Sequence, residues 1–157
     1  MAASGEELRD LLRRFPTGVA VVTVDLEGER LGLTIGTLVE LSFAPPLVGF
    51  AVRREAALHE LVRRSGDFGL NLLAADQIHV AQHFARGVPP IALWEGIEVR
   101  ESSGPPLIAG AIGWLIGRIA SEVPAGEHTF FVGDVLSVEQ GVNERRLVYI
   151  DRGYASV

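Results

Sequence analysis

The sequence predicts a mainly β protein with short helices, folded as an antiparallel β-barrel. This prediction rests on about seven strand-like runs, only two or three short helical segments, and tight turns between most of the runs. Alternating strand and helix units would instead place a helical pattern between most pairs of strands. The length of 157 residues suits one domain with a real core, so residues 1–157 are expected to form a single unit.

Capping signals and helical spacing predict the helices. Ser4 and Glu7 form a capping-box pattern, and apolar residues then recur at helical spacing as far as residue 15. Two further amphipathic segments end at Gly66 and Gly87, and glycine is the usual residue just beyond a helix C-terminus. The expected helices cover residues 4–15, 57–66 and 75–87.

The expected strands are rich in β-branched and aromatic residues and are separated by turn residues. A hairpin with the turn LEGE at residues 26–29 is predicted near the N-terminus, and long strands dominate the C-terminal third. Residues 88–106 are rich in proline and glycine and are expected to wrap the surface. The expected strands cover residues 17–25, 30–43, 47–52, 67–73, 97–100, 107–123, 128–140 and 145–153.

Charge and composition exclude several classes of function. Fourteen basic residues against twenty acidic ones give a net charge of −6, the wrong sign for a protein that binds nucleic acid by neutralising phosphates. Every basic residue is an arginine, so no lysine can form a Schiff base or a Walker-type phosphate site. The absence of cysteine excludes disulfides, thiolate nucleophiles and thiolate metal ligands.

Targeting signals are also absent from the sequence. No apolar run approaches the ~20 residues that a membrane helix requires. The first residues, MAASGEELRDLLRRF, are acidic where a secretory signal needs basic residues. A cytoplasmic location is therefore expected, with neither a membrane nor a nucleic acid as partner.

Local catalytic motifs are sparse. His79 and His83 have the spacing of zinc-protease ligands, but Val80 replaces the required glutamate, so a plain helix face is favoured and no metal is expected. No G-x-G-x-x-G loop is present, and Gly113 and Gly117 are better explained as bends or close backbone approaches within a strand. The chain also lacks the G-x-S-x-G elbow of serine hydrolases.

His128 and Tyr154 have two interpretations each. His128 follows a tight turn at the start of a strand, so it is either a turn residue bonded to nearby backbone or a donor held at the rim of the barrel. Tyr154 lies near the C-terminus, where an aromatic ring most often caps the core. The residues alone do not decide between these interpretations.

Seven blocks carry a family resemblance over nearly the full length of the chain. They are RRFPTGVAVVTV, GLTIGTLVELSFAPPLVGFAV, GDFGLNLLAADQ, QHFA, PPLIAGAIGWLIGRI, GEHTFFVGDV and LVYIDRGYASV. In this order they resemble the flavin reductase-like proteins of the FMN-binding split-barrel superfamily, which are small NAD(P)H:flavin oxidoreductases. The resemblance implies an antiparallel split β-barrel, a homodimer, FMN or FAD as cofactor, NADH or NADPH as co-substrate, and delivery of reduced flavin to a partner monooxygenase.

The resemblance also implies site residues. Backbone amides and hydroxyls would bind the edge of the isoalloxazine ring and the phosphate, and His128 would orient the nicotinamide as the catalytic residue. The implied flavin-binding residues are Thr34, Ile35, Gly36, Thr37, Leu41, Ser42, Arg53, Arg54 and Ala56. The implied nicotinamide side consists of Thr17, Gly18, His128 and Tyr154.

The chain departs from the family pattern in the flavin-binding segments. The family usually has a serine or asparagine at the position of Gly36, and hydroxyl residues where Glu40, Ala56 and Leu58 stand. Arg53 or Arg54 is expected to replace the missing donors with a charge-assisted contact. Two alternatives stay open: a flavin- or nucleotide-binding protein without catalysis, and a dimeric scaffold with a degenerate flavin site.

Overall fold

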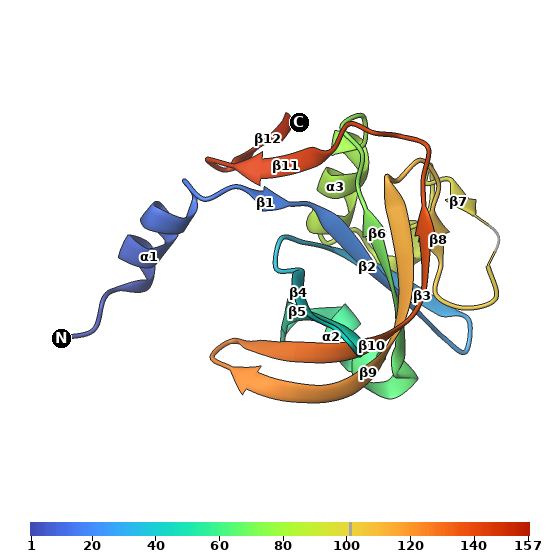
Figure 1. Ribbon diagram of the computed structural model, residues 1–157, viewed down its shortest axis with the longest axis horizontal. Coiled ribbons are helices and arrows are strands. Elements are labelled where there is room, and N and C mark those ends of the chain that lie inside the picture. Colours follow the sequence, from blue (N-terminus) through green and yellow to red (C-terminus); the bar gives the residue numbers. More distant parts are fainter. Residues whose placement is uncertain (101) are drawn as a thin grey trace.

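A curved seven-stranded sheet forms the centre of the computed structural model, which describes residues 1–100 and 102–157 (Figure 1). Its neighbouring strands are all antiparallel. In spatial order they are β3 (Glu29–Ile35), β2 (Ala20–Leu26), β6 (Asp67–Leu72), β9 (Gly113–Ala125), β10 (His128–Gln140), β5 (Pro46–Arg53) and β4 (Val39–Phe43). The predicted antiparallel β fold is confirmed, and the sheet stays open between its edge strands β3 and β4.

Two smaller sheets and short helices surround the central sheet. The smaller sheets pair β1 (Thr17–Gly18) with β11 (Leu147–Ile150) and β12 (Gly153–Ser156), and β7 (Val99–Arg100) with β8 (Leu107–Ile108). The helices are α1 (Gly5–Leu12), α2 (Ala57–Ser65), α3 (Ile78–Ala85) and the 3-10 helix η1 (Pro90–Ala92). Of the helices in the described ranges, none has the length and apolar character needed to cross a bilayer.

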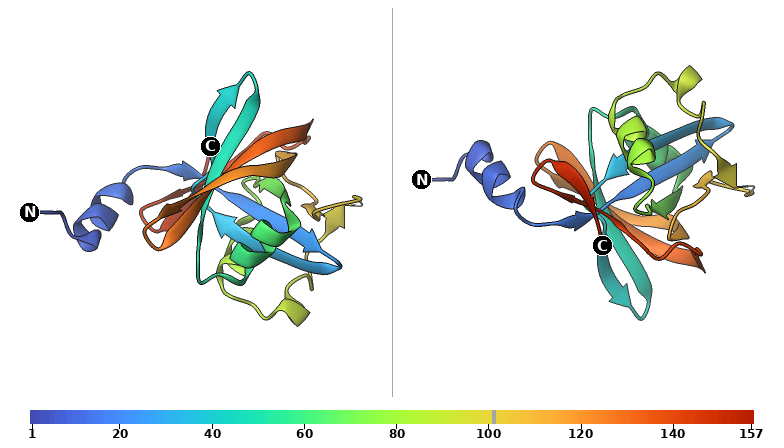
Figure 2. Two further views of the ribbon diagram at one scale, coloured as in Figure 1. Left: turned by 90° about the horizontal axis from the view of Figure 1, so that it is seen from below. Right: turned by 90° about the horizontal axis from the view of Figure 1, so that it is seen from above.

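The three predicted α-helices are confirmed, and the capping box of α1 is formed. The amide of Glu7 donates to the hydroxyl of Ser4 at 3.1 Å, and the amide of Ser4 donates to the carboxylate of Glu7 at 2.7 Å. Helices α2 and α3 pack against β2 and β3. In contrast, α1 buries none of its residues and projects away from the rest of the chain (Figure 2).

The core is organised around three phenylalanine rings. The ring of Phe50 lies 5.0 Å from that of Phe68, nearly edge to face, and 5.7 Å from that of Phe131. The ring of Phe68 also presses against Gly117 on β9 and Gly133 on β10, where an added Cβ would lie 2.3 and 2.5 Å from it. The predicted close approach at Gly117 is therefore confirmed, because any larger residue there would displace the ring.

The single strand predicted over residues 30–43 is wrong. β3 ends at Ile35 and β4 begins at Val39, and the two strands lie on opposite edges of the central sheet. We call residues 36–38, which connect them, the crossing segment. The apolar and β-branched pattern continues through this segment, but its pairing partner changes from β2 to β5.

The strand predicted over residues 107–123 is also divided. β8 and β9 are separated by a turn in which Gly110 has a φ of +86°, a conformation that glycine adopts without strain. Residues 145–153 contribute β11, and the following residues turn back as β12. The turn between them holds Asp151 and Arg152 at φ values of 50° and 61°, which suits a tight hairpin.

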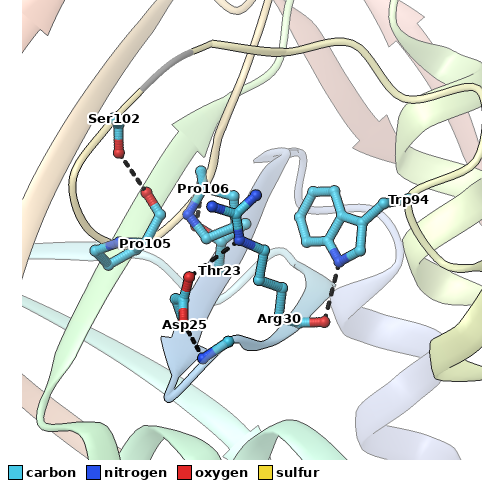
Figure 3. Close-up of polar contacts among 8 residues, drawn as sticks. Thr23, Asp25, Arg30, Trp94, Ser102, Pro105 and Pro106 are labelled. Carbon is cyan, nitrogen blue, oxygen red and sulfur yellow. Dashed lines mark hydrogen bonds and ion pairs between the residues drawn. The ribbon is translucent and has the colours of Figure 1, made fainter.

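Residues 88–106 wrap the surface as predicted, within the part of that range that the structure describes. The indole of Trp94 donates a hydrogen bond to the carbonyl of Arg30 at 3.0 Å, on the β2–β3 hairpin (Figure 3). The buried hydroxyl of Thr23 donates to the carbonyl of Pro106 at 2.7 Å. These bonds fasten the wrapping segment to the central sheet at Trp94 and at its C-terminal end.

Candidate functional site

The segment expected to bind flavin begins at the end of β3 and continues into the crossing segment. The hydroxyl of Thr34 donates a hydrogen bond to the carbonyl of Ala81 on α3, at 2.6 Å. The hydroxyl of Thr37 accepts a bond from the amide of Ala51 at 3.0 Å and donates one to the carbonyl of Ala51 at 3.1 Å. Both hydroxyl protons are used inside the chain, which leaves backbone amides as the donors that this segment can offer a ligand.

A cavity of about 230 Å³ lies where the end of β3 meets the C-terminal hairpin. The rings of Tyr149 and Tyr154 form one wall, with their centroids 5.3 Å apart. Gly36 also lines the cavity, and Thr17 lies against it, because an added Cβ would be only 2.9 Å from the hydroxyl of Thr17. The lining residues are Val19, Thr34, Ile35, Gly36, Ala85, Tyr149 and Tyr154.

This cavity fits the edge of a flat aromatic ligand. Tyr149, Tyr154, Val19 and Ile35 supply apolar surface, and Gly36, which is exposed and has no side chain of its own, supplies backbone polar groups. An aromatic ring packs favourably against such walls, and backbone amides can bond the polar edge of the ring. The residues present therefore fit the flavin that the resemblance implies.

A larger groove of about 620 Å³ adjoins the cavity, and Tyr149 lines both. Thr17 and Glu127 also line this groove, together with residues of α1 and Arg152. The guanidinium of Arg152 lies 3.7 Å from the carboxylate of Asp10. The groove thus has both apolar and charged lining on the side of α1, where Leu8 and Leu12 alternate with Arg9 and Arg13.

Three charged or titratable residues meet at the rim beside β10. Arg53 and His128 are directly opposite each other in the β5–β10 register. Glu127 lies between their side chains, with a carboxylate oxygen 3.4 Å from Nη2 of Arg53 and the other 4.0 Å from Nδ1 of His128. We call Arg53, Glu127 and His128 the rim cluster.

Other expected residues lie apart from the cavity. Leu41 and Ser42 are on β4, whereas Arg54 and Ala56 follow β5. The amide of Arg54 donates to the carbonyl of Glu127 at 3.1 Å, and Ala56 begins α2 without a side-chain cap. These four residues are not among the described residues that line the cavity. The flavin-binding residues expected from the sequence therefore lie in separate regions of this single chain: some line the cavity, and others lie on β4 or follow β5.

Two site residues were missed by the sequence interpretation. Tyr149 faces the cavity because it pairs with Tyr154 across the β11–β12 hairpin. The continuous run of apolar, β-branched and aromatic residues in LVYI was a signal for a strand, but it did not show which side chain faces the cavity. Glu127 directly precedes His128, and only the pairing of β5 with β10 brings its carboxylate to Arg53.

The histidine pair on α3 has a structural explanation. Nε2 of His83 lies 2.5 Å from the carbonyl of Leu93, whereas His79 is exposed. Among the described residues, no group of three or more potential ligands is placed to hold a metal ion. The helix-face interpretation accounts for both residues.

Comparison with known proteins identifies the family. The family model for the flavin reductase like domain matches residues 12–157. The chain belongs to this family. It is 38% identical over 149 residues to the reductase component of 4-hydroxyphenylacetate 3-monooxygenase from Thermus thermophilus, covering 95% of this chain and 94% of the relative. It is 36% identical over 135 residues to an NADH-dependent FAD reductase from Streptomyces globisporus, covering 83% of this chain and 74% of that protein.

Solved structures of flavin reductases share the fold. The flavin reductase component BorF of a bacterial two-component tryptophan halogenase superposes with a TM-score of 0.91 at 32% identity, covering 98% of each chain. The Streptomyces globisporus NADH:FAD oxidoreductase SgcE6, in complex with NAD and FAD fragments, superposes with a TM-score of 0.90 at 28% identity. That match covers 99% of this chain and 95% of the other. The expected family and fold are both confirmed.

Burial raises the pKa of the Tyr154 phenol above its ordinary value, and the neighbouring Tyr149 adds to the shift. We predict that Tyr154 ionises at a higher pH than a free tyrosine. Because the folded chain keeps this proton to a higher pH than the unfolded chain, the free energy of unfolding should fall as pH rises above about 10.

The chain has only two tyrosines, so a titration of phenolate absorbance can be assigned with two variants. Tyr154→Phe should remove a transition that lies above the midpoint of a free tyrosine and should weaken the alkaline loss of stability. Tyr149→Phe should leave the Tyr154 transition above that midpoint, because burial is the main cause of the shift. If the transition lost in Tyr154→Phe has the midpoint of a free tyrosine, about pH 10, the phenol of Tyr154 is not desolvated.

Proposed function

We propose that this protein is an NAD(P)H-dependent flavin reductase, which transfers a hydride from NADH or NADPH to FMN or FAD. The observation that carries the proposal is the cavity between Gly36 and the tyrosine pair, in a chain whose relatives are named as reductases over nearly its full length. Reduced flavin would pass to a partner monooxygenase, as the name of the Thermus relative implies for that protein.

The flavin, when bound, supplies the redox chemistry, because hydride transfer between nicotinamide and flavin requires no protein nucleophile. The chain contributes position. Backbone groups at Ile35 and Gly36 would bond the polar edge of the ring, and Thr37 holds the crossing segment on β5. Leu41 and Ser42 on β4 lie apart from the cavity in one chain, so they would contact the ring only through a second copy in the proposed dimer.

The phosphate side depends on the residues after β5. Ala56 has no hydroxyl, and the amide end of α2 carries no side-chain cap. Arg53 and Arg54 are both exposed and stand where a phosphate can reach them. We assign them the phosphate contact, because a guanidinium forms charge-assisted and often bidentate bonds with phosphate oxygens.

The nicotinamide side is assigned to Thr17, Gly18, His128 and Tyr154. Thr17 lies against Gly36, and Tyr154 forms the cavity wall beyond it. His128 is half-buried at the start of β10, where a ring nitrogen can contact a carboxamide. These residues would keep water from one side of the nicotinamide and flavin rings and would orient the nicotinamide, which donates the hydride.

Specific observations favour one alternative, a flavin-binding protein without turnover. The hydroxyls of Thr34 and Thr37 are engaged inside the chain, and Ala56 offers none. The lack of free hydroxyl donors at these positions would weaken flavin binding but leave the fold intact. Glu40 is exposed on β4, so its carboxylate has access to solvent.

We also propose that the protein is a homodimer, that it is located in the cytoplasm, and that residues 1–157 form one domain. The dimer is supported by exposed apolar side chains on the projecting helix and on the edge strand, which a second copy can cover. They are Leu8, Leu11, Leu12, Phe15, Val39, Leu41 and Phe43.

Replacing Leu12 by Asp should shift the mass measured by light scattering toward the monomer, because a charge would then lie in the apolar interface. An unchanged mass would remove α1 from the interface.

Mixing the purified protein with excess FMN and NADH under anaerobic conditions tests the function directly. Bleaching of the flavin absorbance should accelerate strongly, and NADPH should be tried in parallel. His128→Asn should slow the bleaching by about tenfold, because orientation of the nicotinamide is reduced. No acceleration with either nucleotide, although flavin binds, would favour the non-catalytic alternative.

Arg53→Ala should weaken the binding of FMN by about three- to tenfold and leave riboflavin almost unchanged, because only FMN carries the phosphate. Fluorescence quenching during flavin titration measures both affinities. Arg118→Ala is a matched control, since Arg118 is also an exposed arginine paired with a carboxylate, that of Asp67, and lines neither the cavity nor the groove. Equal losses for FMN and riboflavin would remove Arg53 from the phosphate contact.

A further inference from the structure

The ion pair between Arg53 and Glu127 stands at the edge of the candidate site. Both side chains are largely exposed, at 54% and 63%, and a single contact of 3.4 Å joins them. Glu127 also lines the groove that shares Tyr149 with the cavity. The carboxylate that holds Arg53 is therefore on the side from which a ligand would approach.

The backbone fixes Glu127 in this place. Gly126 adopts a φ of +58° in the turn between β9 and β10, and the carbonyl of Glu127 accepts a hydrogen bond from the amide of Arg54 at 3.1 Å. The turn is thus fastened to the end of β5, next to Arg53. The backbone of Glu127 is therefore held beside Arg53, whereas its exposed side chain can rotate and take the carboxylate away from the guanidinium.

Other arginines of the chain are held more firmly. Arg118 contacts both oxygens of Asp67, at 2.8 and 3.4 Å. Arg63 lies 3.0 Å from Glu122 and 3.5 Å from Glu60. Arg53 has one longer contact, so its guanidinium is easier to remove from its partner.

We infer that Glu127 is a specificity-determining residue that competes with a ligand phosphate for Arg53. This inference rests on the proposed function. Without phosphate, the guanidinium pairs with Glu127. A flavin phosphate, which carries more charge than a carboxylate and offers bidentate acceptors, displaces it. Glu127 thereby lowers the advantage of phosphorylated over unphosphorylated flavin.

Competition for Arg53 differs from simple repulsion between Glu127 and the phosphate. Repulsion would act whether or not Arg53 is present, whereas competition disappears when Arg53 is removed. His128 is the other group that faces Glu127, and its contribution is separated in the same way. A double-mutant cycle therefore isolates the mechanism.

The experiment titrates the full-length protein with FMN and with riboflavin, using fluorescence quenching at low ionic strength. The variants are Glu127→Gln, Arg53→Ala and the double variant. Glu127→Gln should raise the affinity for FMN about two- to fivefold, the range expected for release from an exposed ion pair, with riboflavin unchanged. In the Arg53→Ala background the same substitution should have no effect.

Glu122→Gln is the matched control, because Glu122 is also an exposed carboxylate paired with an arginine, on the neighbouring strand. It should change neither affinity. An unchanged FMN affinity in Glu127→Gln, an equal gain for riboflavin, or a gain that persists without Arg53 would each overturn the inference.

Anaerobic flavin reduction by the wild-type protein keeps the two proposals distinguishable. If the wild type reduces FMN but Glu127→Gln does not alter FMN affinity, the reductase function stands and the role of Glu127 is wrong. If the wild type neither binds nor reduces FMN, the proposed function fails, and the inference is overturned with it.

Discussion

The hydroxyl of Thr37 holds together the part of the fold on which the site depends. It bonds both the amide and the carbonyl of Ala51, and so fastens the crossing segment to β5. Without this contact, the chain between β3 and β4 would have little to define its path between opposite edges of the sheet. The position of Gly36 against Thr17, and with it one wall of the cavity, follows from that path.

A second constraint gives the sheet its curvature. The ring of Phe68 occupies the space that side chains would need at Gly117 and Gly133. β9 and β10 are each 13 residues long, and their register shifts between Val132 and Gly133. Bulges and glycines of this kind bend long strands around a core, and β3 and β4 are the unpaired edges of the curved sheet.

Local pattern predicted most elements but not the way they meet. Ser4 and Glu7 predicted the start of the first helix, because a capping box is formed within four consecutive residues. The break after Ile35 had no such local signal, because its cause is the contact of Thr37 with a residue 14 positions away. Long-range pairing likewise brought Tyr149 opposite Thr17 and the start of β10, next to Glu127, opposite Arg53, so the sequence pattern offered no reason to select Tyr149 or Glu127.

The candidate site contains few groups that a motif search can detect, and the proposed chemistry explains why. A cofactor that carries the reaction leaves the protein to supply position, apolar walls and backbone donors. Such groups are ordinary components of any β-sheet. Their significance at Gly36, Tyr149 and Tyr154 comes only from being brought around one cavity. In our proposal, Arg53 and Glu127 then influence which ligand binds. Their exposed ion pair is weak, so the guanidinium can exchange the carboxylate for another partner at little cost in free energy.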